Sequence, residues 1–302
     1  MINFKNIELQ DKEWVNPLLA LSDFRGTEYC FTSLYIWSSI YNTQIAQFEQ
    51  MLLIRSADEE YFYYLYPAGK VDLAKAVEFM MEDARTAGKK FAFNSLTQEN
   101  KEELERLFPD KFEFSQTRNS FDYIYEREAL ATLTGKKYQP KRNFISRFKE
   151  IPGWQYETIS HLEPERCSEL LEECFQMNEK WCKMSACNHN ASKRQECCAV
   201  RRALKDFIAL ELEGGLLRVD GEVVAYTVGE PLNSDTYIVH IEKAFSDIKG
   251  AYPMINQSFV LDRTEKFKYI NREDDAGDEG LRKAKLSYNP VFMIEKYFAI
   301  PK

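Results

Sequence analysis

The stretch YINREDDAGDEGLRKAKLSYNP occupies Tyr269–Pro290 and shows how this chain is built. It starts in a short strand-like run, Lys268–Asn271, and continues through an acidic loop that contains glycines. One or two helical turns are expected over Gly280–Ser287, and a final strand over Val291–Phe298. This order predicts a strand–loop–helix–strand segment of an α/β fold. Acids, glycines and lysines gathered between two strands mark it as a functional surface.

The residues before this stretch continue the alternation of strands and helices. Asp220-Gly221 lies between two strand-like runs and is a strong signal for a two-residue hairpin loop. Strands are expected at Trp154–Ile159, Gly215–Val219, Val223–Gly229 and Thr236–Ala244, and helices at Glu163–Lys183, Ser192–Leu212 and from about Gly250.

The first half of the chain follows a similar plan. Thr97, followed by Asn100 and by acids, predicts a capped helix start. The strand-like runs of this half are Ile45–Arg55, Tyr61–Tyr66 and Lys90–Asn94, followed by a closing pair of strands, Phe112–Ser115 and Ser120–Tyr125. Helices are expected at Trp14–Ser22, Asp72–Ala87 and Thr97–Leu107. The hairpins Met51–Tyr66 and Leu216–Gly229 hold similar positions in the two halves, which indicates an internal duplication.

A length of 302 residues allows two domains. We expect an N-terminal domain over residues 1–132, a basic linker helix over 133–152, and a C-terminal domain over 153–302 that carries the active site. The linker LTGKKYQPKRNFISRFKEI holds six cations with almost no acid, among them Lys136, Lys141 and Arg142. It is either a solvated linker helix or a phosphate-facing patch.

Composition excludes several classes. Hydrophobic residues make up 44% and charged residues 29%, as in a globular protein. The net charge of −8 leaves no general attraction to nucleic acid or to an anionic membrane, so a polyanion would need the local basic patch. No apolar run of about 18 residues and no signal-like start are present. We therefore expect a cytoplasmic protein without stable membrane insertion.

The seven cysteines, an odd number, fit a reducing compartment. Cys182, Cys187, His189 and Cys197 could be read as zinc ligands. No C-x-x-C pair is present, however, and Cys167, Cys174 and Cys182 have helical spacing. We therefore expect thiols and no metal site.

The element order of the second half resembles the GNAT acyltransferase fold. In that fold a loop after the central strand cradles a pyrophosphate at a helix N-terminus. The matching residues here, Ser246–Tyr252, keep Gly250 but place Asp247 and Tyr252 at the ends of the loop. An acid and a large ring are unfavourable there, so acyl-coenzyme A is the less expected donor.

Tyr269–Pro290 also resembles the signature of proteins related to the catalytic domain of phosphatidylglycerol lysyltransferases. Further matches are Tyr226–Glu230, His240–Ala244, Gly250–Tyr252, Ile255-Asn256 and Lys141–Asn143. The resemblance covers essentially the whole chain. It implies an α/β (α+β) fold of two tandem GNAT-like domains, each a mixed twisted sheet flanked by helices, akin to the Fem-type aminoacyl transferases.

The resemblance also implies a reaction. Known members move an amino acid from aminoacyl-tRNA to an amine or hydroxyl acceptor, so tRNA is an expected partner through the basic patch. The lysyltransferases carry a membrane-embedded half that this sequence does not show. The expected acceptor is therefore a small-molecule or peptide amine rather than a lipid, and no further cofactor is predicted.

Acyl transfer of this kind requires a base for the acceptor, donors for the oxyanion and a proton for the leaving group. Glu242, on the strand face that also carries His240, is one candidate base; Asp274 and Asp275 are rivals. Tyr288 lies where GNAT enzymes often hold a proton-donating tyrosine, and Lys285 resembles a Fem-type lysine near substrate phosphates. The candidate substrate-binding residues are Lys136, Lys141, Arg142, His240, Lys243, Gly250, Asn271, Arg282 and Lys285.

Plainer interpretations stay open. Residues 273–279 could be a solvated acidic loop. A calcium loop fails, because Gly277 falls where a ligand belongs and Leu286 replaces the terminal glutamate. His240 could be a satisfied buried imidazole, and Glu242 could pair with Lys243 or Arg282 for structure alone. The alternatives to aminoacyl transfer are an acyl-coenzyme A-dependent N-acetyltransferase and a non-catalytic binding protein that retains the fold.

Overall fold

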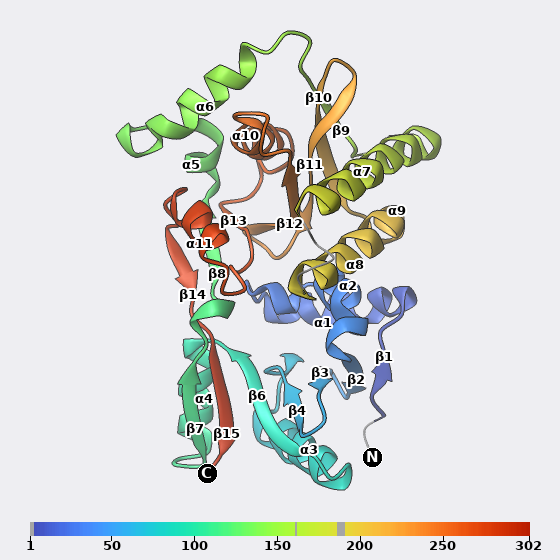
Figure 1. Ribbon diagram of the computed structural model, residues 1–302. Coiled ribbons are helices and arrows are strands. Elements are labelled where there is room, and N and C mark those ends of the chain that lie inside the picture. Colours follow the sequence, from blue (N-terminus) through green and yellow to red (C-terminus); the bar gives the residue numbers. More distant parts are fainter. Residues whose placement is uncertain (1–2, 161, 186–190) are drawn as a thin grey trace. The chain divides into compact units, whose positions relative to one another are not determined.

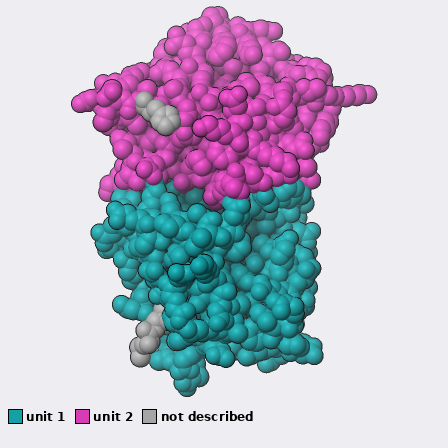
Figure 2. Space-filling model, turned by 180° about the vertical axis from the view of Figure 1, so that it is seen from behind, with its two compact units in different colours: residues 1–123, 273–285, 292–302 teal, residues 124–272, 286–291 magenta. Residues whose placement is uncertain are grey.

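The computed structural model describes residues 3–160, 162–185 and 191–302. The chain forms two compact units, which Figure 2 shows in two colours. Unit 1 comprises residues 1–123, 273–285 and 292–302, and unit 2 comprises 124–272 and 286–291. Within the described residues, no helix is both long enough and apolar enough to span a bilayer.

Unit 1 is built on a mixed sheet in the order β1-β2-β3-β4-β6-β15-β7, with β5 beside β3. Its strands are β1 (Lys5–Asn6), β2 (Gln44–Phe48), β3 (Met51–Ala57), β4 (Tyr61–Tyr64), β5 (Ala68–Gly69), β6 (Lys90–Leu96), β7 (Phe112–Gln116) and β15 (Tyr297–Pro301). Its helices are α1 (Lys12–Ser22), α2 (Phe31–Tyr41), α3 (Leu73–Thr86) and α4 (Gln98–Leu107), and α11 (Glu279–Leu286) belongs to it up to residue 285.

Local sequence explains these helices. Asp72 accepts a hydrogen bond from the Lys75 N–H at the start of α3, and Thr97 and Asn100 form the reciprocal capping box of α4. The apolar face of α3 packs with Phe91 and Phe93 of β6 into the core of unit 1.

Unit 2 contains most of a second sheet in the order β14-β8-β13-β12-β11-β10-β9. The strands of this sheet are β8 (Asp122–Glu126), β9 (Gln155–Thr158), β10 (Glu213–Val219), β11 (Glu222–Pro231), β12 (Thr236–Ala244), β13 (Tyr269–Asn271) and β14 (Phe292–Ile294), of which β14 and the first two residues of β8 belong to unit 1. Its helices are α5 (Arg127–Thr132), α6 (Gln139–Lys149), α7 (Pro164–Met184), α8 (Ala191–Lys205), α9 (Phe207–Leu210) and α10 (Ala251–Arg263).

The sheet of unit 2 opens in its middle. β10 and β11 form the predicted hairpin, whose loop residues Asp220 and Gly221 both have positive φ. β12 runs antiparallel to β11 over most of its length, but pairs in parallel with β13 only over Thr236–Ile238. The second half of β12 therefore has β11 on one side only. α10 packs on one face of these strands and α7 on the other (Figure 1).

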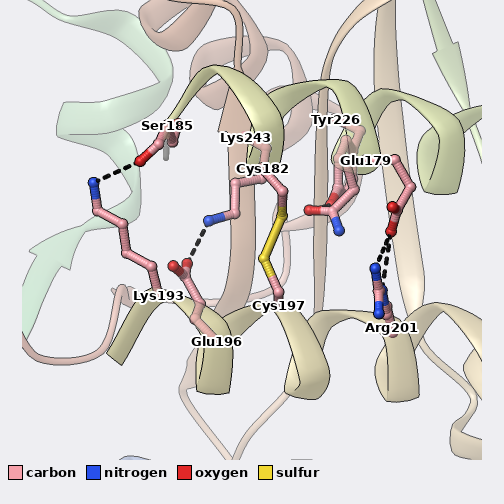
Figure 3. Close-up of a disulfide and its surroundings, with 10 residues drawn as sticks. Glu179, Cys182, Ser185, Lys193, Glu196, Cys197, Arg201, Tyr226 and Lys243 are labelled. Atoms are coloured by element: carbon pink, nitrogen blue, oxygen red, sulfur yellow. Dashed lines mark hydrogen bonds and ion pairs between the residues drawn. A yellow bond between two sulfur atoms is a disulfide. The ribbon is translucent and has the colours of Figure 1, made fainter. Parts of the chain in front are cut away.

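Helices α7 and α8 are joined by a disulfide between Cys182 and Cys197 (Figure 3). This corrects the expectation of free thiols at these two positions, since neighbouring helices bring together cysteines 15 residues apart. Cys30, Cys167, Cys174 and Cys198 are not part of a disulfide. The other two residues of the zinc interpretation, Cys187 and His189, lie outside the described residues.

Three strand predictions need correction. Ile45–Arg55 is not one strand but the hairpin of β2 and β3. β7 and β8 are not a pair: β7 lies beside β15 and β8 beside β13, in different sheets, because the 3-10 turn Arg118–Ser120 redirects the chain. Val291–Phe298 likewise divides into β14 and the start of β15, which join different sheets.

The compact units also divide the chain differently from the boundaries expected at residues 132 and 152. The C-terminal strand β15 lies between β6 and β7, so the end of the chain belongs to unit 1. β8 pairs with β13, and residues 124–132 therefore belong to unit 2 together with the basic helix α6.

Candidate active site

Glu242 lies on the part of β12 that has separated from β13. Its Oε1 accepts a hydrogen bond from Arg272 Nη2 at 2.8 Å, and its Oε2 accepts one from Asn256 Nδ2 of α10 at 2.9 Å. The side chains of Glu242 and Arg272 are each 11% exposed. Arg272 directly follows β13, so the divergence of the two strands makes room for this ion pair. The pairings considered from sequence, with Lys243 or Arg282, are not the ones found.

The ring of Tyr288 contacts two cations, Lys141 and the Arg272 of this ion pair. Lys141 Nζ lies 3.8 Å and Arg272 Cζ lies 4.7 Å from the centre of its ring. The backbone carbonyl of Tyr288 accepts a hydrogen bond from the Tyr138 hydroxyl at 3.0 Å, and Lys141 Nζ donates to Ser287 Oγ at 2.7 Å. Cation–π contacts of this kind are worth about 0.5–2 kcal/mol and hold the ring in place.

The electrostatics of this cluster depart from those of a solvated surface. Burial and, to a smaller extent, the positive charge of Arg272 together lower the pKa of Lys141 to about 8, against the opposing effect of Glu242. Burial raises the pKa of the Tyr288 phenol, despite the nearby Arg272. Near neutral pH the cluster thus holds a lysine that readily exchanges a proton and a tyrosine that keeps one.

Asp275, in unit 1, is held in a network of its own. It is fully buried; Oδ2 accepts from Arg282 Nε at 2.8 Å and from the Tyr123 hydroxyl at 2.6 Å, and Oδ1 accepts from Arg282 Nη2 at 2.8 Å and the Gly277 N–H at 3.0 Å. Burial alone would raise its pKa, but these hydrogen bonds lower the pKa well below the usual range. A carboxylate with so many donors is suited to shaping the loop rather than to accepting a proton.

Asp274 differs sharply from its neighbour. Burial is the main cause that raises its pKa to about 6; Lys296 opposes this effect and Asp122 adds to it. Lys285 Nζ donates to the backbone carbonyl of Asp274, and so fixes the loop rather than reaching outward. Lys285 is 8% exposed.

The other predicted residues lie in separate places. His240 Nε2 lies 3.0 Å from Glu230 Oε1. Lys243, on the opposite face of β12 from Glu242, bonds Glu196 and lies 3.6 Å from the Trp181 ring (Figure 3 shows the Glu196 contact). Asn271 is fully buried in β13 and Lys136 is exposed, whereas Arg142 donates to the carbonyls of Leu133 and Gly135 and so fixes the turn before α6.

A family model described as "Phosphatidylglycerol lysyltransferase, C-terminal" matches residues 19–300. The chain belongs to this family. A crystal structure of a conserved protein of unknown function from Bacteroides thetaiotaomicron is 40% identical over the whole of both chains, with a TM-score of 0.93.

Solved C-terminal domains confirm the fold of this family member. The domain of a putative lysylphosphatidylglycerol synthetase from Agrobacterium fabrum superposes with a TM-score of 0.69 at 15% identity, covering 96% of this chain and 91% of that one. An uncharacterised protein of Mycoplasmoides gallisepticum is 26% identical over 187 residues, which are 59% of this chain and 56% of that protein, so the match spans about half of that relative's length. The predicted α/β fold of two mixed sheets flanked by helices is thus confirmed.

The start of α10 in this family member is poorly suited to a pyrophosphate. Gly250 has φ of +91°, and a Cβ added there would lie 2.2 Å from the carbonyl oxygen of Phe144 in α6. The glycine is therefore required by the close approach of α6. In the first turn, the Ala251 N–H already bonds Ile248 and Pro253 has no N–H. Few donors are left for a phosphate.

Sequence reasoning missed Arg272 and Asn256, the two residues that hold Glu242. In the sequence, Asn256 stands out only as part of a family match, and Arg272 is one charge among many in a charged loop. The signal that could have found Arg272 is its place immediately after a strand, at a point where a parallel neighbour carries a buried acid.

Proposed function

We propose that this protein transfers an aminoacyl group from aminoacyl-tRNA to an amine or hydroxyl acceptor, with the chemistry at Lys141, Tyr288, Arg272 and Glu242. The family and the fold support an acyltransferase. The observation that carries the proposal is the stack of Lys141 and Arg272 on Tyr288, because it combines a lysine of lowered pKa with a protonated phenol and a fixed guanidinium.

Each group has a distinct task. The neutral amine of Lys141 accepts the proton of the attacking acceptor nitrogen or oxygen, and a new bond forms to the carbonyl carbon of the ester. Arg272 stabilises the negative charge on the carbonyl oxygen. As the ester C–O bond breaks, the Tyr288 hydroxyl gives its proton to the departing 3′-oxygen and regains one from the Lys141 ammonium.

Glu242 is assigned a positioning role, because both of its oxygens already accept hydrogen bonds from Arg272 and Asn256. Asp274 belongs to unit 1 and has a raised pKa of about 6, and it is assigned no step in this reaction. Asp275 is proposed to order the loop.

Binding of tRNA is proposed at α6 and the turn before it. Lys136, Lys137, Arg147 and Lys149 are exposed there, and the ring of Phe144 is 43% exposed between them. Exposed cations interleaved with an aromatic ring suit a phosphate backbone with unstacked bases.

The test of the reaction uses a pool of charged tRNA with labelled amino acids, incubated with amines, short peptides or phosphatidylglycerol vesicles. We expect label to pass to one acceptor class. Lys141→Met should lower the rate by about 10²–10⁴-fold, while Lys205→Met, which removes an exposed cation of α8 outside the proposed tRNA-binding surface, should leave the rate unchanged. No transfer to any acceptor, or equal rates for both variants, would contradict the proposal.

Coenzyme A-dependent acetylation is the second candidate, and the crowded start of α10 argues against it. Calorimetry with coenzyme A and acetyl-coenzyme A separates the two functions. We expect no heat of binding at micromolar concentrations; micromolar affinity would reverse the assignment of the donor.

A further inference from the structure

The first turn of α2 in unit 1 is a buried group of hydrogen-bond donors. Phe31, Thr32 and Ser33 are 2%, 0% and 5% exposed. Their N–H groups precede the first intrahelical bond, which the Leu34 N–H makes to Cys30, and the side chain of Cys30 caps none of them. A helix start without a cap presents unsatisfied donors and a partial positive charge.

The hydroxyls of the same turn add two further polar atoms. Thr32 Oγ1 and Ser33 Oγ are buried and have no hydrogen-bond partner among the residues that the structure describes. The Cα–Cβ bond of a helical residue tilts toward the N-terminus, so these hydroxyls face the same end as the free N–H groups. Burying a hydroxyl without a partner costs about 1–3 kcal/mol, and two adjacent cases indicate a missing acceptor.

An acceptor atom without a donor lies just before this turn. Glu28 Oε1 accepts from Lys296 Nζ at 2.6 Å, whereas Glu28 Oε2 is buried and unpartnered within the described part of the chain, as is Thr27 Oγ1. Lys296 Nζ also donates to Asp122 Oδ1 at 2.8 Å, so its ammonium links Asp122 to Oε1 of Glu28. Three residues of chain span at most about 10 Å, which keeps Glu28 close to the start of α2.

The unsatisfied donors and the unsatisfied carboxylate oxygen belong to residues within five positions of one another in the chain, and together they define the chemistry of a ligand. It must offer acceptor oxygens to the start of α2 and N–H donors to Glu28. A phosphate supplies only the first and would be repelled by the acid. A free α-amino acid supplies both within three bonds.

We propose that residues 27–33 bind a free α-amino acid, with its carboxylate at the N–H and hydroxyl groups of Thr32 and Ser33 and its ammonium at Glu28. This site lies in unit 1 and uses none of the residues assigned to acyl transfer. It therefore stands or falls independently of the proposed reaction.

The test measures thermal shifts and calorimetric affinities for the 20 common L-amino acids. For any amino acid that binds, two analogues test the two proposed contacts separately. Its amide lacks the carboxylate that would contact Thr32 and Ser33, and its 2-hydroxy acid lacks the ammonium that would contact Glu28. We expect each analogue to bind at least about tenfold more weakly, since each leaves a buried group unpaired. Inorganic phosphate alone should not bind.

Variants distinguish binding from a structural role. Thr32→Val and Ser33→Ala remove the unpaired hydroxyls, so they should leave the free protein as stable as before or more stable, and weaken amino acid binding at least about tenfold. Ser39→Ala, at an exposed position of the same helix, should change neither. Binding of phosphate but not of amino acids, no binding of any amino acid, or affinities unaffected by Thr32→Val and Ser33→Ala would each overturn the proposal.

Discussion

Asp274 gives a prediction in which the sign of a pH dependence tests the burial argument. Burial raises its pKa from 3.8 to about 6. A carboxyl whose pKa is higher in the folded than in the unfolded protein binds protons on folding. Its favourable contribution is complete below about pH 4 and is lost as the pH rises through about 6. Above that pH the folded protein carries a penalty for a buried charge.

The size of that penalty follows from the two pKa values. The interval between 3.8 and about 6 corresponds to about 3 kcal/mol at 1.36 kcal/mol per pKa unit. Partial exposure of the side chain and solvent screening reduce the expected effect to about 1–3 kcal/mol. Asparagine keeps an oxygen for the Ala276 N–H, which bonds Asp274 Oδ1 at 3.0 Å, but it does not ionise.

Asp274→Asn should therefore raise the free energy of unfolding by about 1–3 kcal/mol at pH 8 and by less than about 1 kcal/mol at pH 4. Urea unfolding followed by tryptophan fluorescence at the two pH values measures both quantities. Asp110→Asn is the matched control, since the Asp110 side chain is 99% exposed and asparagine tolerates its positive φ. A loss of stability at pH 8, or the same gain at both pH values, would refute the burial argument.

Three further predictions concern stability and are checked by denaturant or thermal unfolding. Lys296→Met leaves the carboxylate of Asp122 buried without its cation and should lower the free energy of unfolding by about 3–5 kcal/mol. Adding Asp122→Asn should restore part of this loss. Gly250→Ala places a methyl group 2.2 Å from the Phe144 carbonyl at positive φ and should cost about 2–5 kcal/mol. Cys182→Ser removes the disulfide that closes a 15-residue loop and should lower the free energy of unfolding by about 3 kcal/mol. Dithiothreitol should cause the same loss in the unmodified protein and no further loss in the variant.

Features fixed by local chemistry were predictable from the sequence. The Asp220-Gly221 loop adopts the two positive φ values that its residue types favour, and the capping box at Thr97 forms as its spacing indicates. β12 begins and ends at the predicted residues, Thr236 and Ala244. In each case the decisive interactions lie within a few residues of one another.

Features fixed by distant pairing were not predictable in this way. β15 lies between β6 and β7, about 200 residues away in sequence, and no local pattern selects those neighbours. The site follows the same rule. Glu242 and Tyr288 were identified as candidates, but their partner Arg272 depends on where β12 and β13 diverge, which only the sheet register decides.

Helix α6 contacts both the start of α10 and the ring of Tyr288. Its backbone at Phe144 fills the space beside Gly250, and its residue Lys141 reaches the ring of Tyr288. Movement of α6 to admit a pyrophosphate at the start of α10 would therefore also withdraw Lys141 from Tyr288. The proposed reaction therefore calls for a donor whose polyanionic part stays on the exposed, basic side of α6 while only its acyl ester reaches Lys141. Aminoacyl-tRNA has that form, whereas a coenzyme A pyrophosphate would compete with the helix that supplies the lysine.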